Sequence, residues 1–177
     1  MKQKFISVCL LCVLLFSSCT VYKSGMETAD YNQLSKKLPV LEYYYSISGS
    51  SSSMNPNILK QAIKSEVQKN IIQKTGVPMG TLLVECEKLD VNENLLWAVL
   101  SGGTLFAGNL LGMPIVTGKV DMEFSFTIKS LNGTIVRKYN YAQSGHYALG
   151  FYYGEDYEVK ALKLCRKILD EFRNDVK

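Results

Sequence analysis

A run of strictly alternating residues constrains the fold of this chain more than any other feature of its sequence. Over residues 120–129, apolar side chains alternate with polar ones, and the apolar members are Val120, Met122, Phe124, Phe126 and Ile128. Successive side chains of a strand point to opposite faces, so the pattern predicts a strand with one buried and one solvated face. Asn132-Gly133 is typical of a tight turn, and residues 135–142 are predicted to return as the hairpin partner.

Two amphipathic helices are predicted to cover the buried face of the sheet. Asn55 suits the N-cap and Pro56 the first position of one helix, which Gly76 and Pro78 are expected to end. Its apolar stripe is Leu59, Ile63, Val67 and Ile71. The second helix is predicted at about residues 156–173, with a stripe formed by Tyr157, Ala161, Leu164, Cys165, Ile168 and Phe172.

Two further strands complete the predicted domain. They lie at residues 40–47, a segment rich in tyrosine, and at residues 80–90. The order strand, helix, strand, insert, strand, strand, helix predicts an α+β fold, with a mostly antiparallel sheet of about four strands and two helices on one face. We place this single domain at residues 38–177.

An apolar insert at residues 94–118 contains 25 positions without a charged side chain. It is long enough for a membrane span, but four glycines and Pro114 interrupt it. We expect two short buried helical pieces, or a helix and a loop, that close the open side of the sheet. The alternative is contact with a membrane or a partner through Leu95, Leu96, Trp97, Leu105, Phe106, Leu110 and Leu111. A membrane β-hairpin is ranked last because the segment lacks alternation.

Aromatic residues crowd the end of the predicted hairpin and the approach to the last helix. They are Tyr139, Tyr141, Tyr147, Phe151, Tyr152, Tyr153 and Tyr157. Such residues fill cores and also form interfaces, and we favour a core role for the group. Within it, the predicted loop at residues 147–154 is the best candidate for binding, through Tyr147, Phe151, Tyr152 and Tyr153.

The sequence gives no pattern for catalysis, a cofactor or a metal, so we expect a protein that is not an enzyme. His146 is the sole histidine and has no partner that sequence spacing could identify. The carboxylate pairs Glu85/Glu87 and Asp121/Glu123 are expected on a solvated strand face. Cys86 and Cys165 are expected as buried thiols, and a disulfide between them remains the alternative.

The amino terminus has the layout of an export signal. Lys2 and Lys4 precede an apolar core at residues 5–16, and two serines precede Cys19. This ending resembles the lipobox of bacterial lipoproteins, although Phe16 stands where leucine is most common. The resemblance implies removal of residues 1–18 and attachment of acyl chains, such as palmitate, to Cys19. Thr20 in place of aspartate implies the outer membrane, facing the periplasm.

The remaining composition limits the partners of the mature protein. Residues 19–37 are expected to form a tether, and loss of the signal lowers the formal charge from +4 to +2, which disfavours nucleic acid. The element order looks like that of small periplasmic domains of envelope lipoproteins, including auxiliary lipoproteins of lipid-transport ABC systems, which implies an adaptor or accessory subunit with a protein partner. The rivals are a carrier of an apolar ligand and a membrane-inserting subunit of an oligomer. The carrier needs an apolar cavity on the order of several hundred Å³, for which the insert and the tyrosines are the candidate lining.

Overall fold

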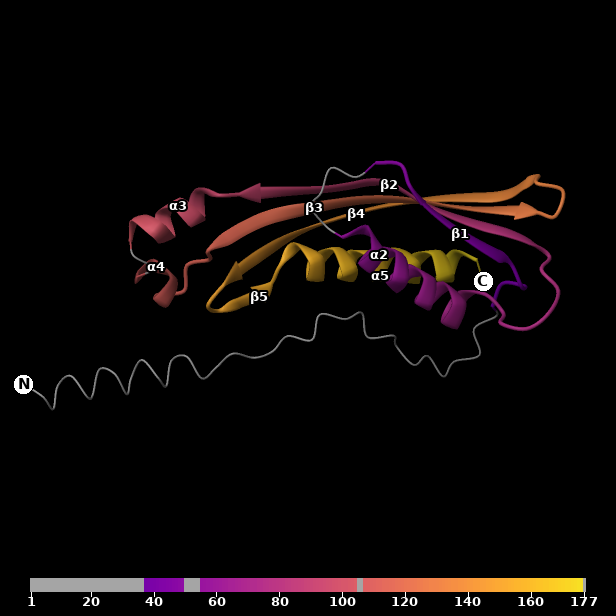
Figure 1. The fold of residues 1–177 in the computed structure, drawn as a ribbon, viewed down its shortest axis with the longest axis horizontal. Coiled ribbons are helices and arrows are strands. Elements are labelled where there is room, and N and C mark those ends of the chain that lie inside the picture. The colour runs from indigo at the N-terminus through magenta and orange to yellow at the C-terminus, as the bar shows by residue number, and fades with distance from the viewer. Residues whose placement is uncertain (1–36, 50–54, 105–106, 177) are drawn as a thin grey trace, which may run out of the picture.

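Five strands form one sheet in the computed structural model, which describes residues 37–49, 55–104 and 107–176 (Figure 1). The signal, Cys19 and nearly all of the predicted tether lie outside the described residues. The elements, in chain order, are β1 (Glu42–Ile47), α2 (Pro56–Glu66), η1 (Val67–Ile71), β2 (Gly80–Asn94), α3 (Leu96–Gly103), α4 (Ala107–Leu110), β3 (Val116–Ser130), β4 (Ile135–Gly150), β5 (Tyr153–Glu155) and α5 (Tyr157–Asp175).

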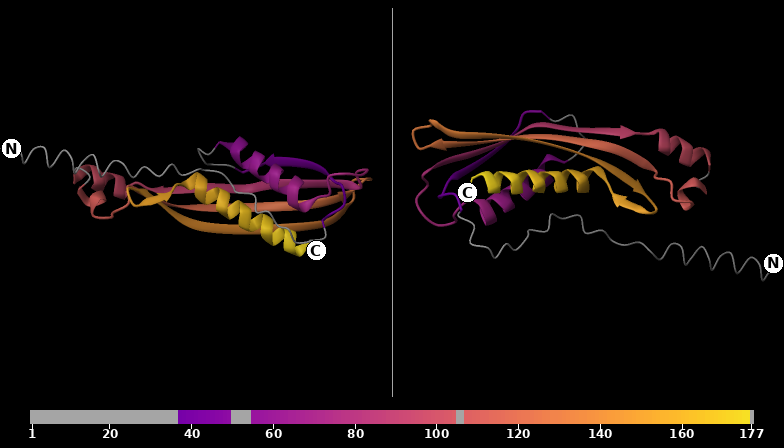
Figure 2. Two further views of the ribbon diagram at one scale, coloured as in Figure 1. Left: turned by 90° about the horizontal axis from the view of Figure 1, so that it is seen from below. Right: turned by 180° about the vertical axis from the view of Figure 1, so that it is seen from behind.

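The sheet has the order β1-β2-β3-β4-β5. β1 pairs with β2 in parallel and every other pair is antiparallel. α2 and α5 lie against the same face of the sheet (Figures 1 and 2). The predicted α+β class, with two helices on one face, is therefore confirmed. The sheet has five strands rather than about four, because the short β5 folds back onto the end of β4.

The first helix begins where the sequence predicts and ends earlier. Asn55 caps it by accepting a hydrogen bond from the Asn57 backbone N–H at 3.0 Å, and the predicted apolar stripe is buried. The π-helical turn η1 closes the helix at Ile71, before Gly76. Leu38 pairs beside this point: its N–H donates to the Ile71 carbonyl at 2.8 Å, and its carbonyl accepts from Gln73 N–H at 3.0 Å. Strand-like hydrogen bonds to Leu38 thus take the place of the helical hydrogen bonds that a longer helix would form.

The predicted β3–β4 hairpin is present, and both strands are longer than the pattern indicated. The alternating apolar side chains from Val120 to Phe126 are buried, and Gly133 occupies the turn with a φ of 80°, a conformation that favours glycine. Pairing continues to Val116 opposite Leu149, well beyond the predicted strand ends. The far end of this ladder therefore projects past the helices (Figure 1).

An aromatic cluster holds α5 on the sheet. The Phe172 ring stacks on Phe126 with a centroid distance of 4.2 Å, and Tyr139 and Tyr141 meet the same ring edge-on at 5.4 and 6.4 Å. The Tyr141 hydroxyl also donates to the Asp175 carboxylate at 2.7 Å. Phe172 is fully buried, so it joins the last helix to both strands of the hairpin.

Cys86 and Cys165 are both buried free thiols. Burial raises the pKa of Cys86 to about 12, and it raises the pKa of Cys165 as well. Neither thiol forms thiolate readily at neutral pH, and both fill core volume as small apolar side chains, as the sequence predicts.

Replacement of Phe172 by alanine is expected to lower the free energy of unfolding by about 3–5 kcal/mol, because it leaves a cavity between α5 and the sheet. Urea unfolding followed by circular dichroism measures the change. Phe151→Ala serves as the control, since the Phe151 side chain is 57% exposed and should lose less than about 1 kcal/mol. Equal losses in the two variants would contradict this assignment of the core.

Candidate contact surface

The apolar insert forms the tip of a long β2–β3 hairpin. α3 and α4 lie beyond the end of the sheet, opposite the β3–β4 turn (Figures 1 and 2). The prediction that the insert closes the open side of the sheet is therefore wrong. Asn94 pairs with Thr117, so the two strands carry the insert past the region that α2 and α5 cover.

Most described apolar side chains of the insert face solvent. The exposed ones are Leu95, Leu96, Val99, Leu100, Leu110, Leu111 and Met113. Trp97 is half-buried, and Leu105 and Phe106 lie outside the described residues. Four of the seven contact residues proposed from the sequence are thus exposed at one end of the molecule.

The predicted binding loop at residues 147–154 is the end of β4, a tight turn and β5. Tyr147 is buried, so its assignment to a binding loop is wrong, whereas Phe151, Tyr152 and Tyr153 are exposed. The difference arises because residues 147–149 pair with β3 as a strand, which turns the Tyr147 ring toward the core.

The exposed aromatic turn lies against the insert. The Tyr152 hydroxyl donates to the Leu110 carbonyl and the Tyr153 hydroxyl to the Gly112 carbonyl, both at 2.9 Å. The two regions that the sequence offered as separate candidates are therefore one surface. We call it the apolar end and define it by the exposed side chains of Leu95, Leu96, Val99, Leu100, Leu110, Leu111, Met113, Leu149, Phe151, Tyr152 and Tyr153.

The apolar end has no charged side chain within its two segments. Residues 94–118 and 147–154 both lack Asp, Glu, Lys and Arg. Charges appear at its boundary, where Lys119 pairs with Asp121 at 2.8 Å and Lys163 with Glu155 at 2.9 Å, while Glu93 accepts a hydrogen bond from the Tyr147 hydroxyl. The apolar end is therefore an uncharged surface with charged residues at its boundary.

Polar side chains within the apolar end bond to its own backbone. The Thr104 hydroxyl donates to the Leu100 carbonyl at 2.9 Å, and the Asn109 amide donates to the Met113 carbonyl at 3.0 Å. With the two tyrosine hydroxyls, the Asn109 amide satisfies three carbonyls that short helices and turns otherwise leave to water, those of Leu110, Gly112 and Met113. The Leu100 carbonyl also accepts from the Thr104 backbone N–H at 3.0 Å, so the Thr104 hydroxyl is its second donor. The Asn109 Oδ1 atom has no partner among the described residues.

Tyr147 braces the base of the apolar end. Its ring lies over Gly118, where an added Cβ would be 2.5 Å from the tyrosine oxygen. Its hydroxyl donates to Glu93 at 3.4 Å, which connects β4 across β3 to β2. Burial, and then the Glu93 charge, raise the pKa of Tyr147 to about 12, so the hydroxyl stays a donor at neutral pH.

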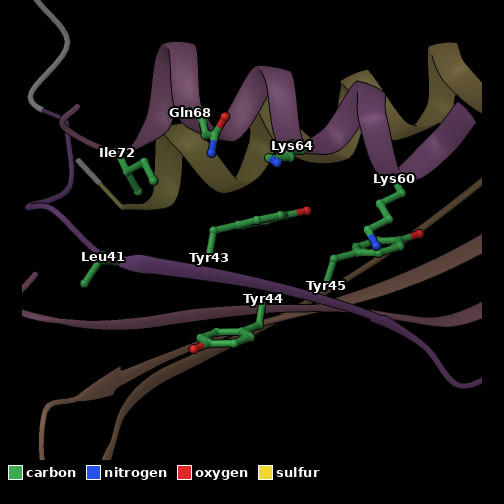
Figure 3. A pocket seen from close by; sticks show the side chains of 8 residues that line it. All are labelled: Leu41, Tyr43, Tyr44, Tyr45, Lys60, Lys64, Gln68 and Ile72. Carbon is green, nitrogen blue, oxygen red and sulfur yellow. The ribbon is translucent and has the colours of Figure 1, made fainter. Parts of the chain in front are cut away.

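A second feature is a cavity of about 410 Å³ between β1 and α2 (Figure 3). Tyr43 and Tyr45 point toward the helix and Tyr44 to the opposite side of the strand. The hydroxyl oxygens of Tyr43 and Tyr45 are buried without a partner among the described residues, and burial raises both pKa values. The complete lining is Leu41, Tyr43, Tyr44, Tyr45, Lys60, Lys64, Gln68 and Ile72.

This cavity differs from the one considered in the sequence analysis. It has the size expected of a ligand site, but the insert does not line it and two lysines do. The sequence showed three consecutive tyrosines without indicating a site. The site becomes apparent only in the tertiary structure, where α2 lies over the edge strand β1.

The other residues considered for chemistry lie apart from both features. His146 is exposed on β4, and Glu85 and Glu87 are separated by a register shift between Cys86 and Lys88. Asp121 binds Lys119. Across residues 37–49, 55–104 and 107–176, no group of three His, Cys, Asp or Glu side chains could hold a metal ion, and no helix is long and apolar enough to cross a membrane.

Comparison with known proteins gives weak likenesses. No family model and no curated protein matches the chain. A minor lipoprotein from Acinetobacter baumannii has a similar solved structure, with 11% identity, a TM-score of 0.33 and coverage of 78% of this chain and 90% of that chain. An uncharacterized lipoprotein B from Nitrosomonas europaea matches with 9% identity, a TM-score of 0.24 and coverage of 78% and 84%. At these TM-scores neither likeness carries an argument about fold or function.

Tyr45→Phe is expected to leave the free energy of unfolding unchanged or to raise it by up to about 1 kcal/mol at pH 7, because the buried hydroxyl has no partner. Tyr141→Phe, which loses the bond to Asp175, should cost about 1 kcal/mol.

The Tyr45→Phe variant also tests how stability depends on pH. A tyrosine whose folded pKa is raised loses its contribution to stability as the pH rises above about 10, where the unfolded chain ionises first. Tyr45→Phe should therefore lose less stability than the wild type between about pH 10 and 12 in chemical denaturation. A steeper alkaline loss in the variant would contradict the burial of this hydroxyl.

The double variant Tyr152→Phe/Tyr153→Phe is expected to loosen the insert, because it deletes both hydroxyl bonds to the Leu110 and Gly112 carbonyls. If the two bonds contribute about 1 kcal/mol to closing this region, amide exchange at Leu111, Gly112 and Met113 should accelerate about fivefold. Hydrogen exchange measured by NMR checks this, with Phe124 N–H as the internal control. Unchanged exchange would show that turn and insert are independent.

Proposed function

We propose that this chain is a lipid-anchored, non-enzymatic protein of the bacterial cell envelope that acts by docking through its apolar end. The observation that carries the proposal is the union of two uncharged segments, one from the β2–β3 tip and one from the β4–β5 turn, in one exposed surface. Contiguous exposed apolar surfaces mark contact sites in soluble domains.

The surface is built for contact and is not a consequence of loose packing. Tyr147 braces its base, and tyrosine hydroxyls tie its two segments together. A preorganised surface loses little conformational entropy on docking, so more of the gain from apolar burial appears as affinity. These features support a role as an adaptor or accessory subunit.

The anchor is proposed from the resemblance at the amino terminus. Acyl chains on Cys19 would hold the domain at a membrane, and Thr20 supports the outer membrane with the domain facing the periplasm. A protein of the envelope is the expected partner in this scheme. With more than one acyl chain, the attachment would be firm.

A second candidate is a ligand carrier that uses the cavity between β1 and α2. The unpartnered hydroxyls of Tyr43 and Tyr45 and the adjacent Lys60 and Lys64 support it. These are donors, so the ligand would carry hydrogen-bond acceptors or negative charge. A purely apolar ligand fits this lining poorly.

A photocrosslinking residue placed at Leu111 in intact cells tests the docking function. We expect adducts with an envelope component from Leu111 and none from Leu131, whose side chain is also exposed (86% and 77%) but lies at the opposite end. Equal labelling from both positions, or none from either, would overturn the proposal. Cys19→Ser tests the anchor separately: the protein should move from the membrane to the soluble fraction.

A further inference from the structure

We infer that the apolar end binds a lipid bilayer, inserting into the same membrane that holds the acyl chains on Cys19. This inference rests on the proposed function, because it names what the docking surface contacts. Its first support is chemical. The side chains that define the apolar end are aliphatic or aromatic, while the hydroxyl of the exposed Thr104 and the amide of the buried Asn109 donate to backbone carbonyls of the insert.

These hydrogen bonds from side chains to backbone carbonyls have a physical meaning. Water satisfies open carbonyls at the ends of short helices, so a tip that stays in solvent needs no such side-chain bonds. In lipid no water is available, and each unsatisfied group costs several kcal/mol. The bonds to the carbonyls of Leu110, Gly112 and Met113 prepare the tip for a dry environment.

The position of the tip limits how deep it goes. α3 has eight residues and a length of about 12 Å, which suits burial at the boundary of headgroups and acyl chains rather than crossing. The boundary ion pairs Lys119–Asp121 and Lys163–Glu155 are positioned to remain at headgroup level or outside it. Because the insert itself carries no charge, apolar burial provides the attraction.

Chain length allows both attachments at once. Leu38 pairs with Ile72, and β1 runs parallel to β2 with Glu42 opposite Thr81, so Lys37 lies at the end of the sheet where β2 starts, opposite the tip. The 15 residues of β2 span about 50 Å, whereas the 18 residues from Cys19 to Lys37 reach at most about 60 Å. The acyl chains and the apolar end can therefore occupy one bilayer when the tether is nearly fully extended, and the resulting two-point attachment would hold the domain in a fixed orientation.

Trp97 makes the inference directly measurable, because it is the sole tryptophan of the chain and lies in α3. The chain from residue 19 onward, with Cys19→Ser and therefore without lipid, is mixed with phosphatidylcholine vesicles. We expect a blue shift of tryptophan emission and quenching by lipids brominated on their acyl chains. Both should persist at 0.5 M NaCl (about 4–5 Å screening length), since the attraction is apolar.

Two pairs of variants test the site. Val99→Asp and Leu111→Asp should each weaken vesicle binding about tenfold or more, because each places a charge where lipid contact is expected. Val77→Asp and Leu131→Asp are the controls, since these side chains are 82% and 77% exposed at the opposite end, and they should bind like the parent. Thermal unfolding by circular dichroism establishes that all four variants are folded.

An unchanged Trp97 spectrum with vesicles, or equal effects of both variant pairs, would overturn the bilayer inference. Protein adducts from Leu111 in cells together with no vesicle response would assign the apolar end to a protein partner. That result would leave the proposed docking function standing. Absence of any adduct from Leu111 would instead remove the docking function itself.

Discussion

The pairing of β3 with β4 is the interaction on which the rest of the structure depends. The ladder runs from the Asn132-Gly133 turn to Val116 opposite Leu149. Its two ends contact different parts of the structure. Near the turn and the middle, Phe126 and its neighbours pack under Phe172 and hold α5. At the far end the same ladder brings the aromatic turn against the insert.

The different contacts at the two ends of the ladder explain how one chain has both a buried apolar core and an exposed apolar surface. α2 and α5 cover only part of the sheet, and the apolar residues beneath them are buried. Beyond the helices, β2 and β3 continue without cover, and Tyr147 over Gly118 supports them from within. The insert therefore needs its own internal hydrogen bonds to remain ordered. Those bonds leave its apolar side chains facing outward.

Several features could be predicted from local sequence because their causes are local. Asn55 and Pro56 set the helix start, and the alternation at residues 120–129 sets the buried face of a strand. The insert was placed wrongly because its position depends on how far β2 and β3 continue. The alternation of β2 changes phase at the register shift between Cys86 and Lys88 and stops after Val91, and residues 116–119 carry no clear alternation. Tyr147 was misassigned for a related reason, since its partner Gly118 lies 29 positions earlier in the sequence.

The cavity between β1 and α2 could not be predicted from the sequence. Tyr43 and Tyr45 share one strand face by simple alternation, but nothing in their spacing says that a helix passes above them and leaves their hydroxyls unpaired. The cavity arises from how α2 packs over β1, two elements that follow one another in the chain. Its volume and lining follow from packing rather than from any short motif.

By itself, the sequence determined where the two long helices and the first four strands lie, which face of each is apolar, and that two segments carry no charge. These properties follow from side-chain chemistry and from the periodicity of each element. Only the tertiary structure decided that the two uncharged segments meet. Their contact depends on the register of a ladder whose hydrogen bonds join residues 116 and 149, and backbone pairing of that kind leaves no mark on residue type.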